Sequence, residues 1–162
     1  MSLFDSEILA KLVEESNKKE AGQVPNVVEF NADADRAEER AYLESIFLSF
    51  PAGKKKQNLK RAFLSADEGQ HLGAWGELVL FDWLDRMEMN PEPEPEIQGV
   101  TPDFIISSLG KEICVEVFVL RHSPQDGDIA KRSGSVWWPE TTATYAAAGG
   151  RIESKLNKYR NC

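Results

Sequence analysis

The chain has 162 residues, of which 41% are hydrophobic and 28% charged, a composition typical of a globular protein of one domain. No apolar run reaches the roughly 20 residues that a membrane-spanning helix needs, and the first residues lack the stages of a signal peptide, so we expect a cytoplasmic protein that binds no membrane. The two cysteines give neither a disulfide framework nor a metal-ligand spacing, and the net charge of −8 speaks against a protein that coats nucleic acid through a global positive field.

The first third of the chain predicts two helices. Apolar residues at helical spacing indicate a short amphipathic helix over residues 2–20, and Gly and Pro interrupt the pattern at residues 22–25. Residues 33–47 are rich in Ala, Glu and Arg and indicate a second helix. This helix ends before the Phe-Pro-Ala-Gly segment at residues 50–53, because proline and glycine do not continue a helix.

A basic strip follows the second predicted helix. Its members are Lys54, Lys55, Lys56, Lys60 and Arg61. We interpret the strip as a solvated connecting loop, with a contact to nucleic-acid phosphate as the alternative. A third helix is predicted over residues 67–89. Alternating Pro and Glu at residues 91–96 then predict an extended spacer, because no helix tolerates that alternation.

After the spacer the pattern changes from helical to extended. Residues 101–107 and 112–120 are short apolar runs rich in Ile, Val and Phe, and residues 108–111 between them include a glycine. This arrangement predicts a β-hairpin. The second run barely alternates between apolar and polar residues, so we expect it to form a central strand covered on both faces.

The C-terminal part of the chain predicts a loop and a final helix. Residues 121–149 read as loop, and Trp137 and Trp138 within it are expected to plug the core or form a lid, with stacking on bases as the alternative. Residues 151–160 have helical spacing. The two histidines, His71 and His122, show no ligand spacing, and we assign them surface or structural roles.

Three carboxylates stand where a hydrophobic core would not place them. Glu116 lies inside the second apolar run, where an unpaired buried charge costs on the order of several kcal/mol. If the hairpin turn is centred between Leu109 and Gly110, Asp103 faces Glu116 with Cβ atoms about 4.5–5.5 Å apart. Glu77 lies on the apolar face of the third predicted helix. Carboxylates aimed at one point suit a hard divalent cation such as Mg²⁺.

This arrangement resembles the PD-(D/E)XK nuclease superfamily, the restriction-endonuclease-like proteins. The family core runs helix, three strands, helix, strand, with a Glu on the first helix, an Asp at the start of the second strand and a Glu or Asp on the third. Here Glu77 matches the helical Glu, Pro102-Asp103 supplies the literal Pro-Asp, and Glu116 supplies the third acid. The resemblance covers about residues 67–162.

The resemblance implies an α/β (α+β) fold in two parts. Residues 1–61 would form an N-terminal helical region that carries the basic strip. Residues 62–162 would form the restriction-endonuclease-like core, with a helix, a three-stranded mixed sheet and a following helix. The family core has one more strand after that helix, whereas the sequence stops at Cys162, so we expect either a fragment of a longer protein or a minimal core.

The sequence departs from the family at its lysine. The lysine should stand two residues after Glu116, and that position is Phe118. Members of the superfamily sometimes take this lysine from the following helix, where Lys155 flanks the apolar stripe and Lys158 lies further round. We predict Lys155 as the active-site lysine and keep Lys158 in reserve, with ordinary surface lysines as the alternative.

The resemblance implies a metal-dependent endonuclease that hydrolyses DNA phosphodiester bonds and is compatible with a homodimer. Asp103, Glu116 and Glu77, with the Val117 carbonyl by analogy, would hold one or two Mg²⁺ or Mn²⁺ ions, which bind a phosphodiester oxygen and lower the pKa of a bound water. Lys155 would orient that water or stabilise the charge on the phosphorus centre. The basic strip and Arg121 would contact nucleic-acid phosphates.

Two other functions stay open. Without the strand lysine, the chain could be a catalytically inactive nuclease-fold domain that binds nucleic acid or protein, in which Lys155 points to solvent. It could also be an unrelated α/β protein-interaction domain whose helical N-terminal half docks a partner. That function predicts that Asp103 and Glu116 lie on opposite faces or far apart.

Overall fold

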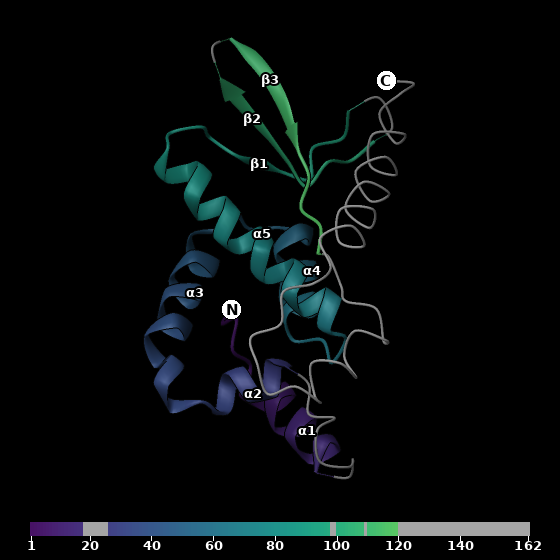
Figure 1. The fold of residues 1–162 in the computed structure, drawn as a ribbon. Helices are drawn as coiled ribbons and strands as arrows, with labels where there is room; N and C mark the ends of the chain where they lie inside the picture. Colours follow the sequence, from purple (N-terminus) through teal and green to yellow (C-terminus); the bar gives the residue numbers. More distant parts are fainter. Residues whose placement is uncertain (18–25, 98–99, 109, 120–162) are drawn as a thin grey trace, which may run out of the picture. The chain divides into compact units, whose positions relative to one another are not determined.

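The structure, a computed structural model, describes residues 1–17, 26–97, 100–108 and 110–119 (Figure 1). The chain divides into two compact units, one formed by Met1–Pro95 with Pro102–Val117 and the other by Glu96–Thr101 with Phe118–Cys162. In the described part of the second unit, Ile97 and Val100 exchange two backbone hydrogen bonds of 2.8 and 2.9 Å. All helices and strands described below belong to the first unit.

The described residues form an α+β fold, which confirms the predicted mixture of helices and strands. Six helical segments precede a small sheet: α1 (Ser6–Ser16), α2 (Asn26–Ala32), the 3₁₀ turn η1 (Ala34–Arg36), α3 (Ala37–Ser49), α4 (Lys54–Phe63) and α5 (Glu68–Arg86). The sheet consists of β1 (Glu92–Pro93), β2 (Phe104–Ser108) and β3 (Lys111–Val115) in the order β1-β2-β3. Both strand pairs are antiparallel, so the described sheet has the three expected strands but is not mixed as predicted. Within the described residues, no helix is long and apolar enough to cross a membrane.

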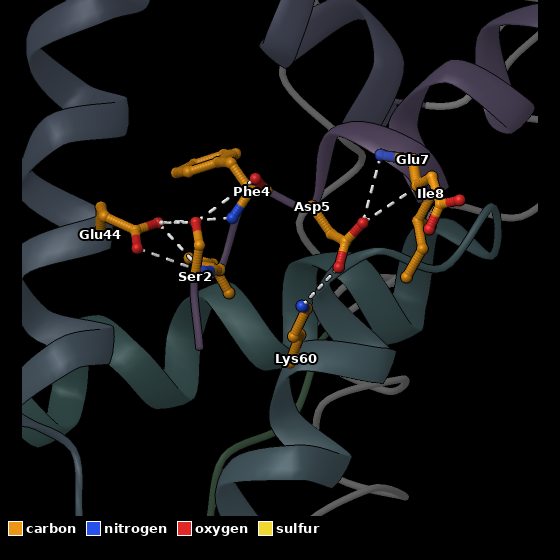
Figure 2. A network of polar contacts seen from close by, with 8 residues as sticks. Ser2, Phe4, Asp5, Glu7, Ile8, Glu44 and Lys60 are labelled. Carbon is orange, nitrogen blue, oxygen red and sulfur yellow. Dashed lines mark hydrogen bonds and ion pairs between the residues drawn. The ribbon is translucent and has the colours of Figure 1, made fainter.

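Helix α1 begins later than the sequence predicts, because Asp5 caps it. Oδ1 of Asp5 accepts hydrogen bonds from the backbone N–H groups of Glu7 and Ile8 (Figure 2). The residues before this cap are tied to α3 instead, since the Glu44 carboxylate accepts the N–H groups of Leu3 and Phe4. Figure 2 shows both anchors, together with the 2.8 Å ion pair between Asp5 and Lys60 of α4.

The second predicted helix is observed as η1 followed by α3. Asp33 caps the start of η1 by accepting a hydrogen bond from the N–H of Asp35. Helix α3 stops at Ser49, and Phe50 after it is already extended, as the following proline requires. Helix α2 was not predicted from the sequence.

The basic strip is a helix, and its interpretation as a connecting loop was wrong. Helix α4 buries Leu59 and Phe63, which are four residues apart and therefore lie on one helical face. Lys56 Nζ donates to the backbone carbonyls of Leu48 and Phe50, so it caps the C-terminal end of α3. Lys60 pairs with Asp5, which ties α4 to the start of α1.

Helix α5 matches the third predicted helix, with Asp67 as its N-cap. Oδ1 of Asp67 accepts the N–H of Gln70 at 2.9 Å. The buried face of α5 belongs to one hydrophobic core that the N-terminal helices and β2 share. From α5 and β2, this core contains Ala74, Leu78, Phe81 and Phe104.

The hairpin forms with the predicted register. Phe104 pairs with Val115 and Ser108 with Lys111, so the turn is centred between Leu109 and Gly110. Gly110 has φ of 74°, a left-handed conformation that glycine adopts at little cost. The predicted extended spacer is observed only in part: Glu92 and Pro93 pair with Ile105 and Phe104 and form β1, whereas Glu94 after them has φ of 48° and is not extended.

The position of β3 in the sheet corrects the prediction of a central strand. Among the described strands, β2 is central and β3 lies at the edge (Figure 1). Ile113 is 45% exposed and Cys114 is exposed, whereas Phe104, Ile105 and Ile106 of β2 are all buried. Although residues 112–120 are mostly apolar, β3 is therefore a partly exposed edge strand and is not covered on both faces.

Candidate acidic site

The predicted acids lie at the junction of α5 and the sheet. Glu77 projects from the middle of α5, Asp103 directly precedes β2, and Glu116 directly follows β3. The strand ladder ends at Phe104 and Val115, one residue short of Asp103 and Glu116, so the predicted pairing of these two acids lies just beyond the observed ladder. In chain order, this part of the molecule is therefore the helix that carries Glu77, then β1, then Asp103 directly before β2, and then Glu116 directly after β3.

Glu77 is balanced by a lysine that the sequence did not link to it. Lys55 Nζ of α4 lies 2.6 Å from Oε2 of Glu77, and both side chains are largely buried, at 13% and 18% exposure. Oε2 is fully buried and receives no hydrogen bond of good geometry from the described residues, so this contact is an ion pair. Burial raises the pKa of Glu77, Lys55 opposes that effect, and the negative charges of Asp103 and Glu94 reinforce it.

Lys55 also contacts a second carboxylate. Its Nζ donates a hydrogen bond of 3.1 Å to Oε1 of Glu94, which follows β1. Burial acts to lower the pKa of Lys55, but Glu77 and Glu94 outweigh it, so the pKa lies above its usual value and the ammonium stays charged. One ammonium thus joins α4, α5 and the end of β1.

Asp103 is held at this junction through its side chain. Oδ2 of Asp103 accepts the backbone N–H of Val117 at 2.7 Å, and its backbone carbonyl accepts the N–H of Glu94 at 3.0 Å. Val117 in turn packs against α5 at Gly76, since a Cβ added to Gly76 would lie 3.2 Å from Cγ1 of Val117. The glycine next to Glu77 therefore lets the end of the hairpin approach the helix closely.

Glu116 is half-buried between two residues that pack on the core. Val115 and Val117 both contact the core cluster, and side chains alternate along an extended chain, so Glu116 does not share their side. Within the part of the chain that the structure describes, no three His, Cys, Asp or Glu side chains form a group that could hold a metal ion. The structure thus brings Glu77 and Asp103 into electrostatic contact, and the role of Glu116 as a third ligand stays a prediction.

The basic strip is used mostly inside the protein. Lys55, Lys56 and Lys60 make the intramolecular contacts described above, whereas Lys54 and Arg61 are exposed. Arg61 donates to Oδ1 of Asn58 at 2.9 Å. The remaining predicted residues lie outside the described part of the chain: Arg121, His122, Trp137, Trp138, Lys155 and Lys158. The predicted contribution of Val117 is its carbonyl, while the observed contact uses its N–H group.

Lys55 and Glu94 are the site residues that sequence reasoning missed. A signal for Lys55 was present, because Lys55, Leu59 and Phe63 recur every four residues. This spacing places Lys55 on the buried face of α4 as soon as the segment is recognised as a helix. Glu94 carries no comparable signal, since the alternation of Pro and Glu at residues 91–96 does not distinguish one glutamate from the others.

His71 lies in a separate, aromatic part of the core. It is 1% exposed, its Nδ1 lies 2.6 Å from the carbonyl oxygen of Phe63, and its Nε2 has no partner among the described residues. Because a carbonyl only accepts, Nδ1 carries the proton. A pocket of about 670 Å³ beside it is lined by Phe30, Trp75 and Arg36 among others. Burial lowers the pKa of His71.

Comparison with known proteins identifies no relative from which a function could be transferred. No family model, curated protein or solved structure matches the chain. The geometry and chemistry of the acidic site are therefore the basis for a proposed function.

Proposed function

We propose that the chain is a metal-dependent nuclease of the PD-(D/E)XK type that hydrolyses DNA phosphodiester bonds. The observation that supports it best is the convergence of Glu77 and Asp103 where α5 meets the hairpin. The order α5-β1-β2-β3 also agrees with the helix and three strands of the family core; Glu77 lies on the helix, while Asp103 and Glu116 each lie one residue outside a strand. The resemblance implies a first strand that the sequence pattern did not locate, and β1 stands at that position in the chain order.

The two carboxylates fit a divalent cation. The negative charge of Asp103 raises the pKa of Glu77, so the two carboxylates lie near enough to act on one another. Mg²⁺ at phosphoryl-transfer sites is commonly held by one or two carboxylates, with water and substrate phosphate completing its shell. Glu77 and Asp103 would therefore hold the ion, with Glu116 and the Val117 carbonyl as predicted further ligands. When bound, the ion supplies charge stabilisation at the phosphate and an acidified water.

The protein's own residues prepare this site for a phosphodiester. Val117 fixes one oxygen of Asp103, so the carboxylate keeps one orientation. The exposed side chains of Lys54 and Arg61 on α4 are available for a DNA phosphate, which partly offsets the acidic charge of the chain. Lys155 remains the predicted lysine that stabilises the charge developing on the phosphate during hydrolysis.

A DNA cleavage assay tests this function. The wild type should cleave plasmid and linear DNA with Mg²⁺ or Mn²⁺ and lose this activity in EDTA. Asp103→Ala should lower the rate about 100-fold or more, because it removes a carboxylate needed in the transition state. The matched control is Glu112→Ala, an exposed acid of β3, which should cleave like the wild type. Equal rates for Asp103→Ala and the wild type would refute the assignment.

A catalytically inactive nuclease-fold domain is the second candidate, and the Lys55–Glu77 ion pair favours it. An ammonium 2.6 Å from the carboxylate already neutralises the charge that a metal ion would otherwise balance. Such a domain would bind nucleic acid or protein without metal. DNA binding that is unchanged by EDTA, together with no cleavage by a folded wild type, would support this candidate over the nuclease.

A further inference from the structure

Lys55 contacts Glu77 from the buried side of its carboxylate. Oε2, the oxygen that Lys55 contacts at 2.6 Å, is fully buried, yet the whole Glu77 side chain is 18% exposed. The exposure therefore belongs to other atoms of the side chain. Lys55 is itself largely buried, at 13% exposure, and its ammonium contacts this buried oxygen.

Lys55 is itself fixed in position. Glu94 accepts a hydrogen bond from its Nζ at 3.1 Å, and Glu94 is in turn held by the hydrogen bond from its N–H to the Asp103 carbonyl at 3.0 Å. The chain of contacts runs from Glu77 through Lys55 and Glu94 to Asp103. The Glu77 carboxylate is thus connected to the backbone carbonyl of Asp103 through Glu94 and a lysine that belongs to neither α5 nor the sheet.

We propose that Lys55 is a positioning residue of the metal site, which holds the buried oxygen of Glu77 and leaves the other oxygen for the metal ion. This inference rests on the proposed nuclease function. Residues behind a ligating carboxylate orient it and commonly change metal affinity 10- to 100-fold when they are replaced. Lys55 comes from α4, before the helix–strand core that carries the acids, so its role does not follow from the order of the acids along the chain.

The sign of the expected effect separates positioning from simple charge. Removing a positive charge near a cation site should strengthen metal binding if only Coulomb attraction matters. If Lys55 positions Glu77, its removal should weaken binding instead, because the carboxylate loses its fixed orientation. A lysine with only a structural role would change the stability of the fold and leave the affinity for metal unaltered.

Mn²⁺ binding, measured by electron paramagnetic resonance of the free ion, tests the proposal. Lys55→Met should bind Mn²⁺ about 10- to 100-fold more weakly than the wild type, and Lys55→Arg should recover part of the loss. Lys111→Met makes the same charge change at an exposed lysine of β3 and should bind like the wild type. Circular dichroism and thermal melting establish that each variant is folded.

Each outcome has a separate meaning. Wild-type affinity or tighter binding in folded Lys55→Met overturns the positioning role and leaves the nuclease assignment intact. If a folded wild type binds no Mn²⁺, the proposed function fails and the role of Lys55 fails with it. If Lys55→Met does not fold, the Glu94→Gln variant tests the proposal instead. This substitution removes the second carboxylate that Lys55 contacts and should weaken Mn²⁺ binding a few-fold. Unchanged Mn²⁺ affinity in Glu94→Gln overturns the proposal.

Discussion

At the scale of single residues, burial decides the ionisation of His71. His71 is enclosed by aromatic rings, with the ring centroids of Phe63 and Trp75 at 4.8 and 5.8 Å from its own. Its Nδ1–H donates to the Phe63 carbonyl, and no carboxylate pairs with its Nε2 in the described residues. The imidazole is therefore folded into the core in its neutral form.

His71 should make the protein less stable in mild acid. Its pKa in the folded state lies below the value of about 6.5 in the unfolded state, so the unfolded state binds the proton more readily. Stability that is present above pH 6.5 is then lost progressively as the pH falls below it. We expect His71→Gln to reduce the difference between the urea midpoints at pH 7.5 and 5.5. His122→Gln is the control and should keep the wild-type difference between the two midpoints. If His71→Gln also keeps that difference, burial of a neutral His71 is not the cause of the acid sensitivity.

Asp103 should contribute to stability as well as to the site. Its side chain accepts the Val117 N–H beyond the end of the regular strand ladder. Asp103→Ala leaves this half-buried donor without its partner and should cost about 1–3 kcal/mol of unfolding free energy. Asp103→Asn keeps an acceptor oxygen and should cost less, although it should impair metal binding. Equal destabilisation by the two substitutions, measured by urea unfolding, would argue against the hydrogen bond.

At the scale of elements, the contact between α5 and the end of the hairpin depends on Gly76. The Cγ1 atom of Val117 occupies the space above this glycine. A side chain there would separate Glu77 from Asp103, because it would push the hairpin end away from the helix. The close approach of these elements is therefore a condition for the acidic site.

Gly76→Leu should destabilise the protein by about 1–3 kcal/mol through overpacking, despite the higher helix propensity of leucine. The control is Gln70→Leu on the same helix, since Gln70 is exposed. Unfolding in urea compares the two variants. If Gly76→Leu is as stable as the control, the packing of Val117 on α5 is not as close as the structure indicates.

At the scale of the whole molecule, strongly periodic segments could be predicted and contacts between distant segments could not. The pattern of residues 67–89 predicted α5, and two apolar runs around a glycine predicted the hairpin and its register. Helix α4 was not predicted, because its five basic residues concealed the helical spacing of its apolar residues. Strand β1 was not predicted either, because two residues, one of them proline, are too few to show a strand pattern. The extent of β3 was overestimated, because its apolar composition resembles that of a buried strand.

The same division applies to the acidic site. Glu77 and Asp103 could be predicted because each is an acid at a position where the pattern calls for an apolar or strand-forming residue. The pairing of Lys55 with Glu77 could not be predicted from that reasoning, since the two residues are separated in sequence and meet through the packing of α4 on α5. The acids of a site can be recognised within single segments of the sequence. The residue that balances their charge can be identified only from the tertiary structure.

Calorimetric titration of the folded chain with Mg²⁺ tests the central claim, a metal site built on the predicted acids, most directly. The wild type should bind the ion, and Asp103→Ala and Glu116→Ala should each lose most of the binding, whereas Glu112→Ala should retain it. Loss in Asp103→Ala but not in Glu116→Ala would restrict the site to Glu77 and Asp103. Absence of Mg²⁺ binding in a wild type that is folded by circular dichroism would contradict the metal-dependent nuclease.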